Sequence, residues 1–256
     1  MAGLSRTLAG RWALVTGGHV RVGRAISLAL AEASMNVLVT YRTSPAAAET
    51  TVAELLALGV DARAFGVDLA DAAAIAHLAE AVLAQAGPSL AVVVNSASVY
   101  PRTALGEISA ETWDAIFAAN LRAPFLLSQR LGLAMKASGG GHIVNLGDWA
   151  GLRPYRCYLP YVVSKAGLIH MTRALALELA PEVQVNCVCP GPVLLPEDYD
   201  TATAETVRRA TPLERLGDPG EIARAVRFFI ESEFATGAIL TVDGGRLIAE
   251  GVTGRT

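Results

Sequence analysis

The sequence predicts an α/β fold: a doubly wound, mainly parallel sheet of seven strands in a single domain over residues 1–256. Short apolar runs alternate with longer helical patterns along the whole chain, which is typical of parallel strands joined by helical crossovers. The apolar runs are nearly continuous in Val, Leu and Ile, as expected of strands that are buried on both faces. No linker-like segment, shift in composition or fixed repeat divides the chain, so we expect one domain.

The expected elements follow one another in an alternating order of strand and helix. Strands are predicted where apolar runs are bounded by Gly, Asp or Asn, over residues 12–16, 37–41, 62–67, 90–95, 142–146, 183–188 and 238–242. Helices are predicted where apolar residues recur every three or four positions, over residues 23–33, 45–58, 72–85, 111–136, 158–180, 204–209 and 219–230. In such sheets ligands bind beyond the carboxyl ends of the strands, so the residues that follow each strand are the candidates for a site.

Composition excludes several classes of protein. With 52% hydrophobic and 18% charged residues the chain is not expected to be disordered, and its net charge of -3 offers no basic excess to nucleic acid. No apolar run approaches the roughly 18 residues of a membrane span, and the N-terminus lacks the apolar stretch of a secretory signal. We therefore expect a cytoplasmic protein without nucleic-acid or membrane partners. The 3 cysteines have neither zinc-ligand nor CxxC spacing. No metal is expected, and Cys187 and Cys189 are predicted to be buried in a strand.

A glycine-rich turn follows the first strand. Residues 16–23 read TGGHVRVG and lead into the first helix. Glycine at a strand-to-helix turn lets the backbone approach a pyrophosphate, whose charge is met by the free N–H groups of the helix N-terminus. Gly17, Val22 and Gly23 are therefore candidates for contact with a dinucleotide. The alternative is a glycine-rich turn without a ligand.

Basic and hydroxyl residues at the end of the second strand favour NADP(H) over NAD. Tyr41, Arg42 and Thr43 lie about 20 residues beyond the turn, where a carboxylate would bind the ribose 2′-hydroxyl of NAD and an arginine accommodates a 2′-phosphate. Arg21 replaces the usual middle glycine of the turn. Two guanidinium groups at one place would offer bidentate hydrogen bonds to phosphate. The alternative is that both arginines are surface residues without a ligand.

Polar residues also follow the third and fourth strands. Asp68, beside Leu69, is a candidate to accept a hydrogen bond from the adenine amino group, and an Asp here is nearly as well suited to capping the next helix. Asn95 ends the fourth strand and is followed by Ser96 and Ala97. We expect this stretch to pass the nicotinamide ribose; a turn-forming role for Asn95 is the alternative.

A Tyr-x-x-x-Lys pair is expected to carry the chemistry. Tyr161 and Lys165 are four residues apart in a predicted helix and so lie on the same face. The Lys165 ammonium is expected to stabilise a phenolate and lower the pKa of Tyr161 from about 10, so that Tyr161 gives a proton to a substrate near neutral pH. With only 6 tyrosines and two lysines in the chain, a chance match is expected roughly 0.05 times. An exposed helical pair is the alternative.

Taken together, these motifs resemble the short-chain dehydrogenase/reductase family. The resemblance rests on the glycine-rich turn at 16–23, Asn95, Asn120 in the long predicted helix, the Tyr161 and Lys165 pair, the Pro-Gly-Pro run at 190–192 and the VDGG run at 242–245. It covers essentially the whole chain.

The resemblance implies a Rossmann fold and a nicotinamide-dependent oxidoreductase that acts on a small molecule and is commonly a homotetramer. It also implies that Lys165 binds the nicotinamide ribose, that Asn120 holds a water in a proton relay, and that Pro190, Gly191 and Val193 contact the cofactor. A substrate lid is implied after the sixth strand, over residues 194–211.

Two departures from the family pattern resemble its pteridine reductase branch. Arg21 stands in the glycine-rich turn, and Asp148 stands 13 residues before Tyr161, where the family usually has a serine. In that branch an aromatic residue stacks on the pterin, and Tyr100 is the candidate for this role. Tyr100, Asp148 and Tyr161 are therefore the expected substrate contacts.

These features predict an NADPH-dependent reductase that transfers hydride to a dihydropterin-like C=N bond, with Asp148, Tyr161 and Lys165 as a proton relay. Such a reduction needs a proton on nitrogen, and Asp148 can take part only if burial outweighs the lowering effect of Lys165 on its pKa. The alternative within the family is a reductase of ketones or 3-oxoacyl thioesters, in which Asp148 only orients Tyr161. A third hypothesis is a protein that senses a dinucleotide without turnover.

Overall fold

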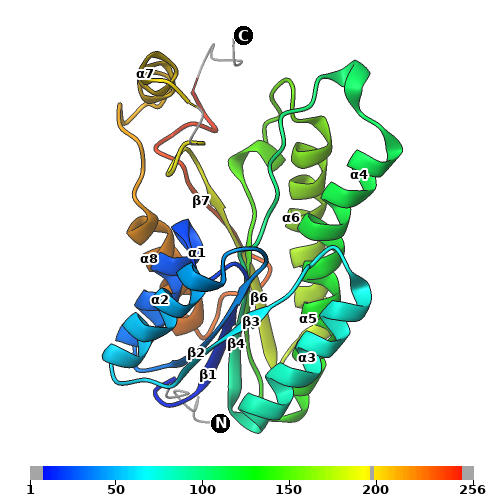
Figure 1. Cartoon of the computed structure of the whole chain (residues 1–256), viewed down its shortest axis with the longest axis vertical. Helices are drawn as coiled ribbons and strands as arrows, with labels where there is room; N and C mark the ends of the chain where they lie inside the picture. Colours follow the sequence, from blue (N-terminus) through cyan, green and yellow to red (C-terminus); the bar gives the residue numbers. More distant parts are fainter. Residues whose placement is uncertain (1–7, 197–198, 250–256) are drawn as a thin grey trace.

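The structure, a computed structural model, describes residues 8–196 and 199–249. Within these residues the centre is a seven-stranded sheet in the order β3-β2-β1-β4-β5-β6-β7, with all neighbouring strands parallel (Figure 1). The strands are β1 (Trp12–Val15), β2 (Asn36–Tyr41), β3 (Ala62–Gly66), β4 (Leu90–Asn95), β5 (Gly141–Leu146), β6 (Val183–Pro190) and β7 (Ile239–Val242). The predicted doubly wound fold is therefore confirmed, and its strand order changes direction between β1 and β4.

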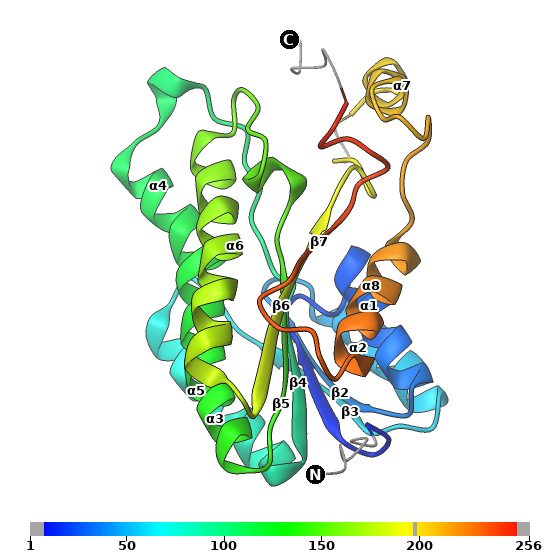
Figure 2. The same cartoon turned by 180° about the vertical axis from the view of Figure 1, so that it is seen from behind.

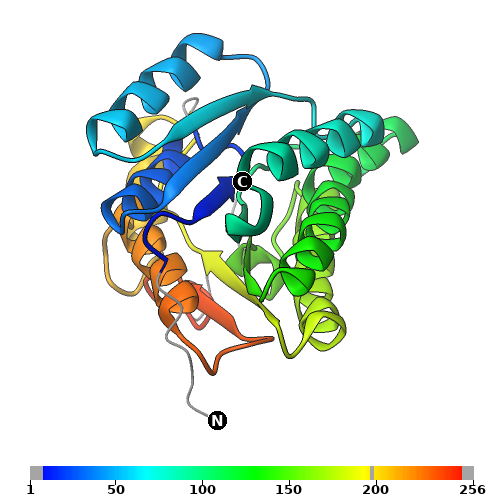
Figure 3. The ribbon, with the colours of Figure 1, turned by 90° about the horizontal axis from the view of Figure 1, so that it is seen from below.

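Helices cover both faces of the sheet, which lies between two helical layers (Figures 2 and 3). One layer contains α1 (Arg21–Glu32), α2 (Pro45–Ala57) and α8 (Pro219–Glu231). The other contains α3 (Ala72–Ala86), α4 (Ala110–Phe117), α5 (Ala123–Ala137) and α6 (Leu159–Leu179). A further helix, α7 (Thr201–Arg209), stands beyond the carboxyl ends of the strands.

Alternate residues of the central strands pack on opposite faces of the sheet. Val15 and Val39 belong to the hydrophobic cluster formed with α1 and α8. Leu14 and Leu38 belong to the cluster formed with α3 and α5. All four side chains are buried, and this burial on both faces explains why the strands are continuous apolar runs in the sequence.

The expected helix over residues 111–136 is interrupted by a π-helical turn, Ala118–Arg122, between α4 and α5. Pro124 has no N–H group to donate to the carbonyl of Asn120, four residues before it. The N–H of Ala123 donates to the carbonyl of Ala118, which lies five residues back as in a π-helix. Turns of this kind are frequent at functional sites, and this one carries Asn120.

Several boundaries differ from the expectation by two or three residues, the usual uncertainty at helix and strand ends. Helix α1 begins at Arg21, α7 begins at Thr201, and β6 continues to Pro190. Cys187 and Cys189 lie in β6 and are buried, which confirms their predicted place. In the described part of the chain, no helix is long and apolar enough to cross a membrane.

Candidate active site

A cleft with a volume of 1770 Å³ lies beyond the carboxyl ends of the strands. Pockets for drug-sized ligands usually have volumes of about 300–1,000 Å³, so the cleft has room for a dinucleotide and a substrate together. All the predicted site residues line it except Asn95 and Asn120. Among the described residues, no group of three or more His, Cys, Asp or Glu side chains is arranged to hold a metal ion.

The turn between β1 and α1 fits the phosphates of a dinucleotide. Gly17 has a φ of +63°, and a Cβ on Gly23 would lie 2.2 Å from the carbonyl oxygen of Gly17. Only glycine therefore fits at position 23 without a shift of the backbone. The first turn of α1 has neither a side-chain cap nor an acidic residue. Its N–H groups are thus available to an anion.

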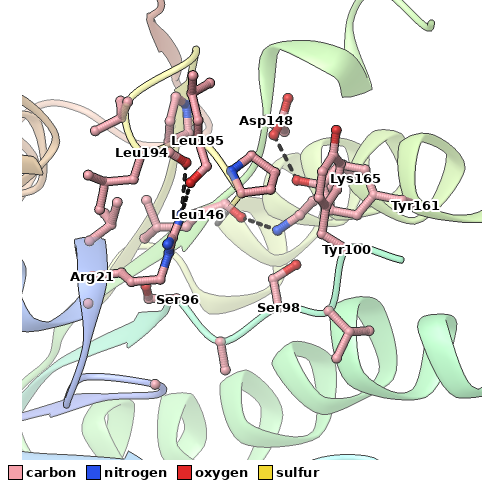
Figure 4. Close-up of a pocket in the computed structure, with 18 of the residues that line it drawn as sticks. Arg21, Ser96, Ser98, Tyr100, Leu146, Asp148, Tyr161, Lys165, Leu194 and Leu195 are labelled. Atoms are coloured by element: carbon pink, nitrogen blue, oxygen red, sulfur yellow. Dashed lines mark hydrogen bonds between the residues drawn. The ribbon is translucent and has the colours of Figure 1, made fainter. Parts of the chain in front are cut away.

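The two arginines expected at the 2′-phosphate lie in different places. Arg42 lines the cleft together with its neighbours in sequence. The Arg21 guanidinium instead donates hydrogen bonds of 2.8 and 3.2 Å to the carbonyls of Leu194 and Leu195, in the segment after β6 (Figure 4). Arg21 begins α1 with a φ of +51°, and its side chain reaches this segment rather than the end of β2. Arg42 is therefore the better placed of the two at the end of β2, and a contact of either guanidinium with a 2′-phosphate stays a prediction.

Asp68 faces the cleft and does not cap a helix. Its Oδ1 accepts a hydrogen bond of 2.9 Å from the N–H of Ala70, whereas the N-cap of α3 is Asp71. The capping alternative for Asp68 is thus wrong, and a contact with the adenine stays a prediction.

The side chain of Asn95 points into the protein interior instead of the cleft. Asn95 Nδ2 donates hydrogen bonds of 2.8 Å to Asn145 Oδ1 and 3.1 Å to Ser128 Oγ, and all three side chains are buried. The Asn95 side chain is therefore not placed to contact a ribose in the cleft, and the passage of this stretch beside the nicotinamide ribose stays a prediction. Ser96 and Ala97, the next residues, do line the cleft.

Asn120 hydrogen-bonds to the backbone of Val99, a residue that lines the cleft. Its Oδ1 accepts a hydrogen bond of 2.8 Å from the N–H of Val99, and its Nδ2 donates one of 2.9 Å to the carbonyl of the same residue. Asn120 Nδ2 also lies 3.3 Å from Ser164 Oγ in α6. The observed contacts are those of a positioning residue, and the water relay stays a prediction.

Asp148, Tyr161 and Lys165 meet at one end of the cleft (Figure 4). The Tyr161 hydroxyl donates a hydrogen bond of 2.7 Å to Asp148 Oδ2, and Asp148 Oδ1 accepts one of 2.8 Å from the N–H of Ala150. Lys165 Nζ donates a hydrogen bond of 2.8 Å to the carbonyl of Leu146. Asp148 follows β5 while the other two side chains come from α6, so the packing of α6 on the sheet brings the group together.

Burial dominates the electrostatics of this group. It raises the pKa of Asp148, although the Ala150 N–H, the Tyr161 hydroxyl and Lys165 each lower this pKa. Burial therefore outweighs the effect of Lys165, as a proton-donating Asp148 requires. Burial also lowers the pKa of Lys165. The pKa of Tyr161 is raised well above its usual value by burial and by the charge of Asp148. The expected lowering of this pKa is therefore wrong for the protein alone, because the hydroxyl contacts Asp148 and Lys165 Nζ lies 5.7 Å from the ring centroid.

Four aromatic side chains, Tyr100, Trp149, Tyr155 and Tyr158, form an aromatic wall beside this group. Tyr100 stacks on Tyr158 at a centroid distance of 4.3 Å and meets the Tyr161 ring edge-on at 4.6 Å. The hydroxyls of Tyr100 and Tyr155 lie 2.9 Å apart, and Tyr155 packs 5.4 Å from Trp149. Tyr100 is predicted from the sequence, whereas Tyr155 and Tyr158 are not, although their place just before Tyr161 is a usable signal.

The segment that is expected to form a substrate lid lines the same cleft. Residues 197 and 198 of this segment are outside the described part of the chain. Helix α7, which belongs to the segment, contributes Thr203, Thr206 and Val207 to the wall of the cleft. Helix α7 therefore forms part of the cleft wall, and its role as a substrate lid stays a prediction.

Comparison with known proteins identifies the family. The family model described as enoyl-(acyl carrier protein) reductase matches residues 20–246. A 3-oxoacyl-[acyl-carrier-protein] reductase of Synechocystis sp. is 34% identical over 240 residues, which cover 92% of this chain and 96% of the relative. The chain belongs to the short-chain dehydrogenase/reductase family. Another relative in this family, the 3-oxoacyl-[acyl-carrier-protein] reductase FabG of Staphylococcus aureus, is 34% identical over 91% of this chain and 96% of its own length.

Solved structures of the family are also similar to the structure of this protein. FolM alternative dihydrofolate reductase 1 from Brucella canis, complexed with NADP, superposes with a TM-score of 0.91 at 29% identity and covers 99% of this chain and 100% of its own. A putative short-chain alcohol dehydrogenase from Sinorhizobium meliloti gives a TM-score of 0.89 at 32% identity, over 94% of this chain and 98% of its own. The protein is therefore an NAD(P)-dependent oxidoreductase of this family, and the prediction of NADP(H) as the cofactor is confirmed by its NADP-bound neighbours.

Proposed function

We propose that the protein is an NADPH-dependent reductase of a dihydropterin-like C=N bond. The observation that carries this proposal is the hydrogen bond of 2.7 Å between the Tyr161 hydroxyl and Asp148, a buried carboxyl group with a raised pKa. The family usually has a serine at the position of Asp148, and an aliphatic hydroxyl is a much weaker acid than a carboxyl group, so Asp148 is the better source of a proton to replace the one that Tyr161 gives up. The FolM neighbour, whose name describes a dihydrofolate reductase, supports the same assignment.

The reaction adds two hydrogen atoms across C=N, and bound NADPH supplies one of them as hydride to carbon. The nitrogen takes a proton from the Tyr161 hydroxyl. When Asp148 is protonated, its O–H donates to Tyr161 Oη, which frees the phenol hydrogen for the substrate and then replaces it. Lys165, whose ammonium is held by the Leu146 carbonyl, limits the build-up of negative charge on the pair.

The second candidate is a reductase of ketones or 3-oxoacyl thioesters. The curated relatives favour this activity over pterin reduction, because 3-oxoacyl-[acyl-carrier-protein] reductases are prominent among them. The description of the family model, enoyl-(acyl carrier protein) reductase, also names an acyl-carrier substrate. In that reaction the Tyr161 hydroxyl protonates a carbonyl oxygen, and Asp148 acts as a positioning residue that accepts the hydrogen bond from Tyr161. Catalytic roles for Asn120 and Lys165, homotetrameric assembly and a cytoplasmic location are further expectations from the family.

The Asp148→Ser variant separates the two candidates. A pterin relay through Asp148 predicts that this variant loses dihydropterin reduction by about a hundredfold or more, while ketone reduction holds or rises. Steady-state NADPH oxidation with both substrate types on one purified protein measures this. If both activities fall in parallel, Asp148 is a positioning residue for either reaction. If the wild-type protein reduces no pterin, pterin reduction is refuted and carbonyl reduction is the remaining candidate function.

A further inference from the structure

A buried arginine lies at the end of the cleft that holds the aromatic wall. Arg246 follows β7 and is 9% exposed. Its guanidinium carbon lies 5.5 Å from the ring centroid of Trp149, and its Nη1 donates a hydrogen bond to the carbonyl of Ala210, just after α7. Arg246 also lines the cleft. It therefore sits between Trp149 of the aromatic wall and the C-terminal end of α7.

The charge of Arg246 has no carboxylate partner among residues 8–196 and 199–249. Burial and the charge of Arg153 both lower its pKa. The neighbouring acid, Asp243, accepts hydrogen bonds from the N–H groups of Gly245 and Leu247. By comparison, Lys165, the other buried cation of the cleft, has Asp148 nearby.

A buried charge without a counter-charge is unfavourable, more so beside a like charge. An anion in the cleft would remove this penalty. Arginine also suits such a ligand, because its planar guanidinium donates two parallel hydrogen bonds to a carboxylate or phosphate. The contact with Trp149 and the hydrogen bond to Ala210 hold the guanidinium in place and leave other N–H donors for a ligand.

We propose that Arg246 binds an anionic group of the substrate, a carboxylate or a phosphate, while the reacting bond lies at Tyr161. This inference rests on the proposed reductase function and names the class of substrate: a planar or acyl group joined to an anionic tail. Two sources of that chemistry fit the site. One is the glutamyl carboxylate of a folate-type pterin, and the other is a phosphate of the pantetheine-bearing carrier of an acyl thioester.

Two substrate pairs test the proposal and distinguish the sources. Dihydrofolate is compared with dihydrobiopterin, which lacks the carboxylates, and acetoacetyl-CoA with its neutral N-acetylcysteamine thioester. In the wild type we expect kcat/KM to favour the anionic member of one pair by tenfold or more. Arg246→Gln should remove the preference and Arg246→Lys should keep part of it. Arg130→Gln, which removes an exposed arginine paired with Glu80, is the matched control and should leave the preference unchanged.

Calorimetry gives a readout that does not depend on turnover. Benzoate and inorganic phosphate should bind the NADP⁺-saturated wild type more tightly than neutral benzamide does, and Arg246→Gln should abolish this difference. If no pterin or thioester is reduced while benzoate still binds through Arg246, the proposed function fails and the anion site stands. The anion site would be overturned if the wild type showed equal kcat/KM and equal affinity for the charged and the neutral compounds. It would also be overturned if Arg246→Gln kept the preference for the charged compounds.

Discussion

Asp148 and Tyr161 share one hydrogen bond, and the protonation state of the carboxyl group decides what that bond does. A charged Asp148 can only accept, so it holds the phenol hydrogen away from a substrate. A neutral Asp148 can donate to Tyr161 Oη and release that hydrogen. Because burial raises the pKa of Asp148, the neutral form extends to higher pH than for an exposed aspartate, as proton donation requires.

Tyr161→Phe removes the hydroxyl that both candidate reactions need. We expect turnover to fall by about 10²- to 10⁴-fold on the best substrate, the range for loss of a positioned general acid. NADPH binding should be retained, since the expected ribose contact is Lys165. Stopped-flow turnover together with a fluorescence titration of NADPH measures both effects, and near-full activity in the variant would refute the proton-donor role.

Asp148→Asn tests the raised pKa through stability. An unfolded chain releases this proton near pH 3.9, whereas the folded protein keeps it to a higher pH because of burial. Between the two pKa values the folded state binds more protons, so the free energy of unfolding of the wild type decreases as pH rises, by about 1.4 kcal/mol per pH unit.

Asparagine does not titrate, so the Tm of Asp148→Asn relative to wild type should increase between pH 4 and pH 8. Thermal unfolding at several pH values gives the result. A Tm difference that stays constant across this range would show that the pKa of Asp148 is not raised.

At the scale of elements, the turn between β1 and α1 joins the fold to the cofactor site. Gly17 N–H donates a hydrogen bond of 3.0 Å to Thr40 Oγ at the end of β2, and Gly23 lies against the Gly17 carbonyl. The same close packing that seats α1 on the sheet leaves the helix N-terminus open to phosphate. We therefore expect the stability of the fold and the binding of the cofactor to be coupled at Gly23.

The Gly23→Ala variant should lower both the stability of the fold and the affinity for NADPH. Its Cβ would lie 2.2 Å from the Gly17 carbonyl oxygen, and relief of such a clash typically costs about 1–3 kcal/mol. We expect a lower Tm and at least a roughly tenfold weaker NADPH affinity, since the turn must open where the pyrophosphate binds. Gly106→Ala is the matched control, because a Cβ there meets no atom within 4 Å. Wild-type affinity in Gly23→Ala would argue against the assigned phosphate site.

At the scale of the whole molecule, the cleft is formed by segments from both halves of the chain. The turn after β1 and the end of β2 line one end, where we expect the dinucleotide, while α6, α7 and the segment after β7 line the other end. A ligand that spans the cleft contacts all of these segments in the folded state alone. Binding should therefore stabilise the entire fold.

NADP⁺ at 100 times its Kd should stabilise the protein by about 2.7 kcal/mol, which raises Tm by roughly 5–11 °C for a chain of this size. NAD⁺ at the same concentration should give a smaller shift, because charge-assisted hydrogen bonds to the 2′-phosphate contribute about 1.5–3 kcal/mol. In Arg42→Asp the advantage of NADP⁺ should disappear. Arg63→Asp, an exposed change on β3 outside the cleft wall, should retain it; equal shifts for both cofactors in the wild type would exclude a role for Arg42 at the phosphate.

Local patterns in the sequence were sufficient to predict the fold and the chemical group at its centre. Apolar runs and helical periodicity determine the strands and helices, because burial on two faces or on one face leaves a characteristic spacing. The glycine-rich turn and the Tyr161 and Lys165 pair are recognisable for the same reason: their function depends on residues that are close in the sequence.

Tertiary structure decided what depends on contacts between distant residues. In the folded protein the Asn95 side chain donates to Asn145, and the Arg21 guanidinium donates to the carbonyls of Leu194 and Leu195. Burial and the neighbouring Asp148 raise the pKa of Tyr161. The tertiary structure also places Arg246 over Trp149, although 97 residues separate them in the sequence. Side-chain direction and burial follow from how the helices pack on the sheet, and no pattern within a single segment of sequence encodes them.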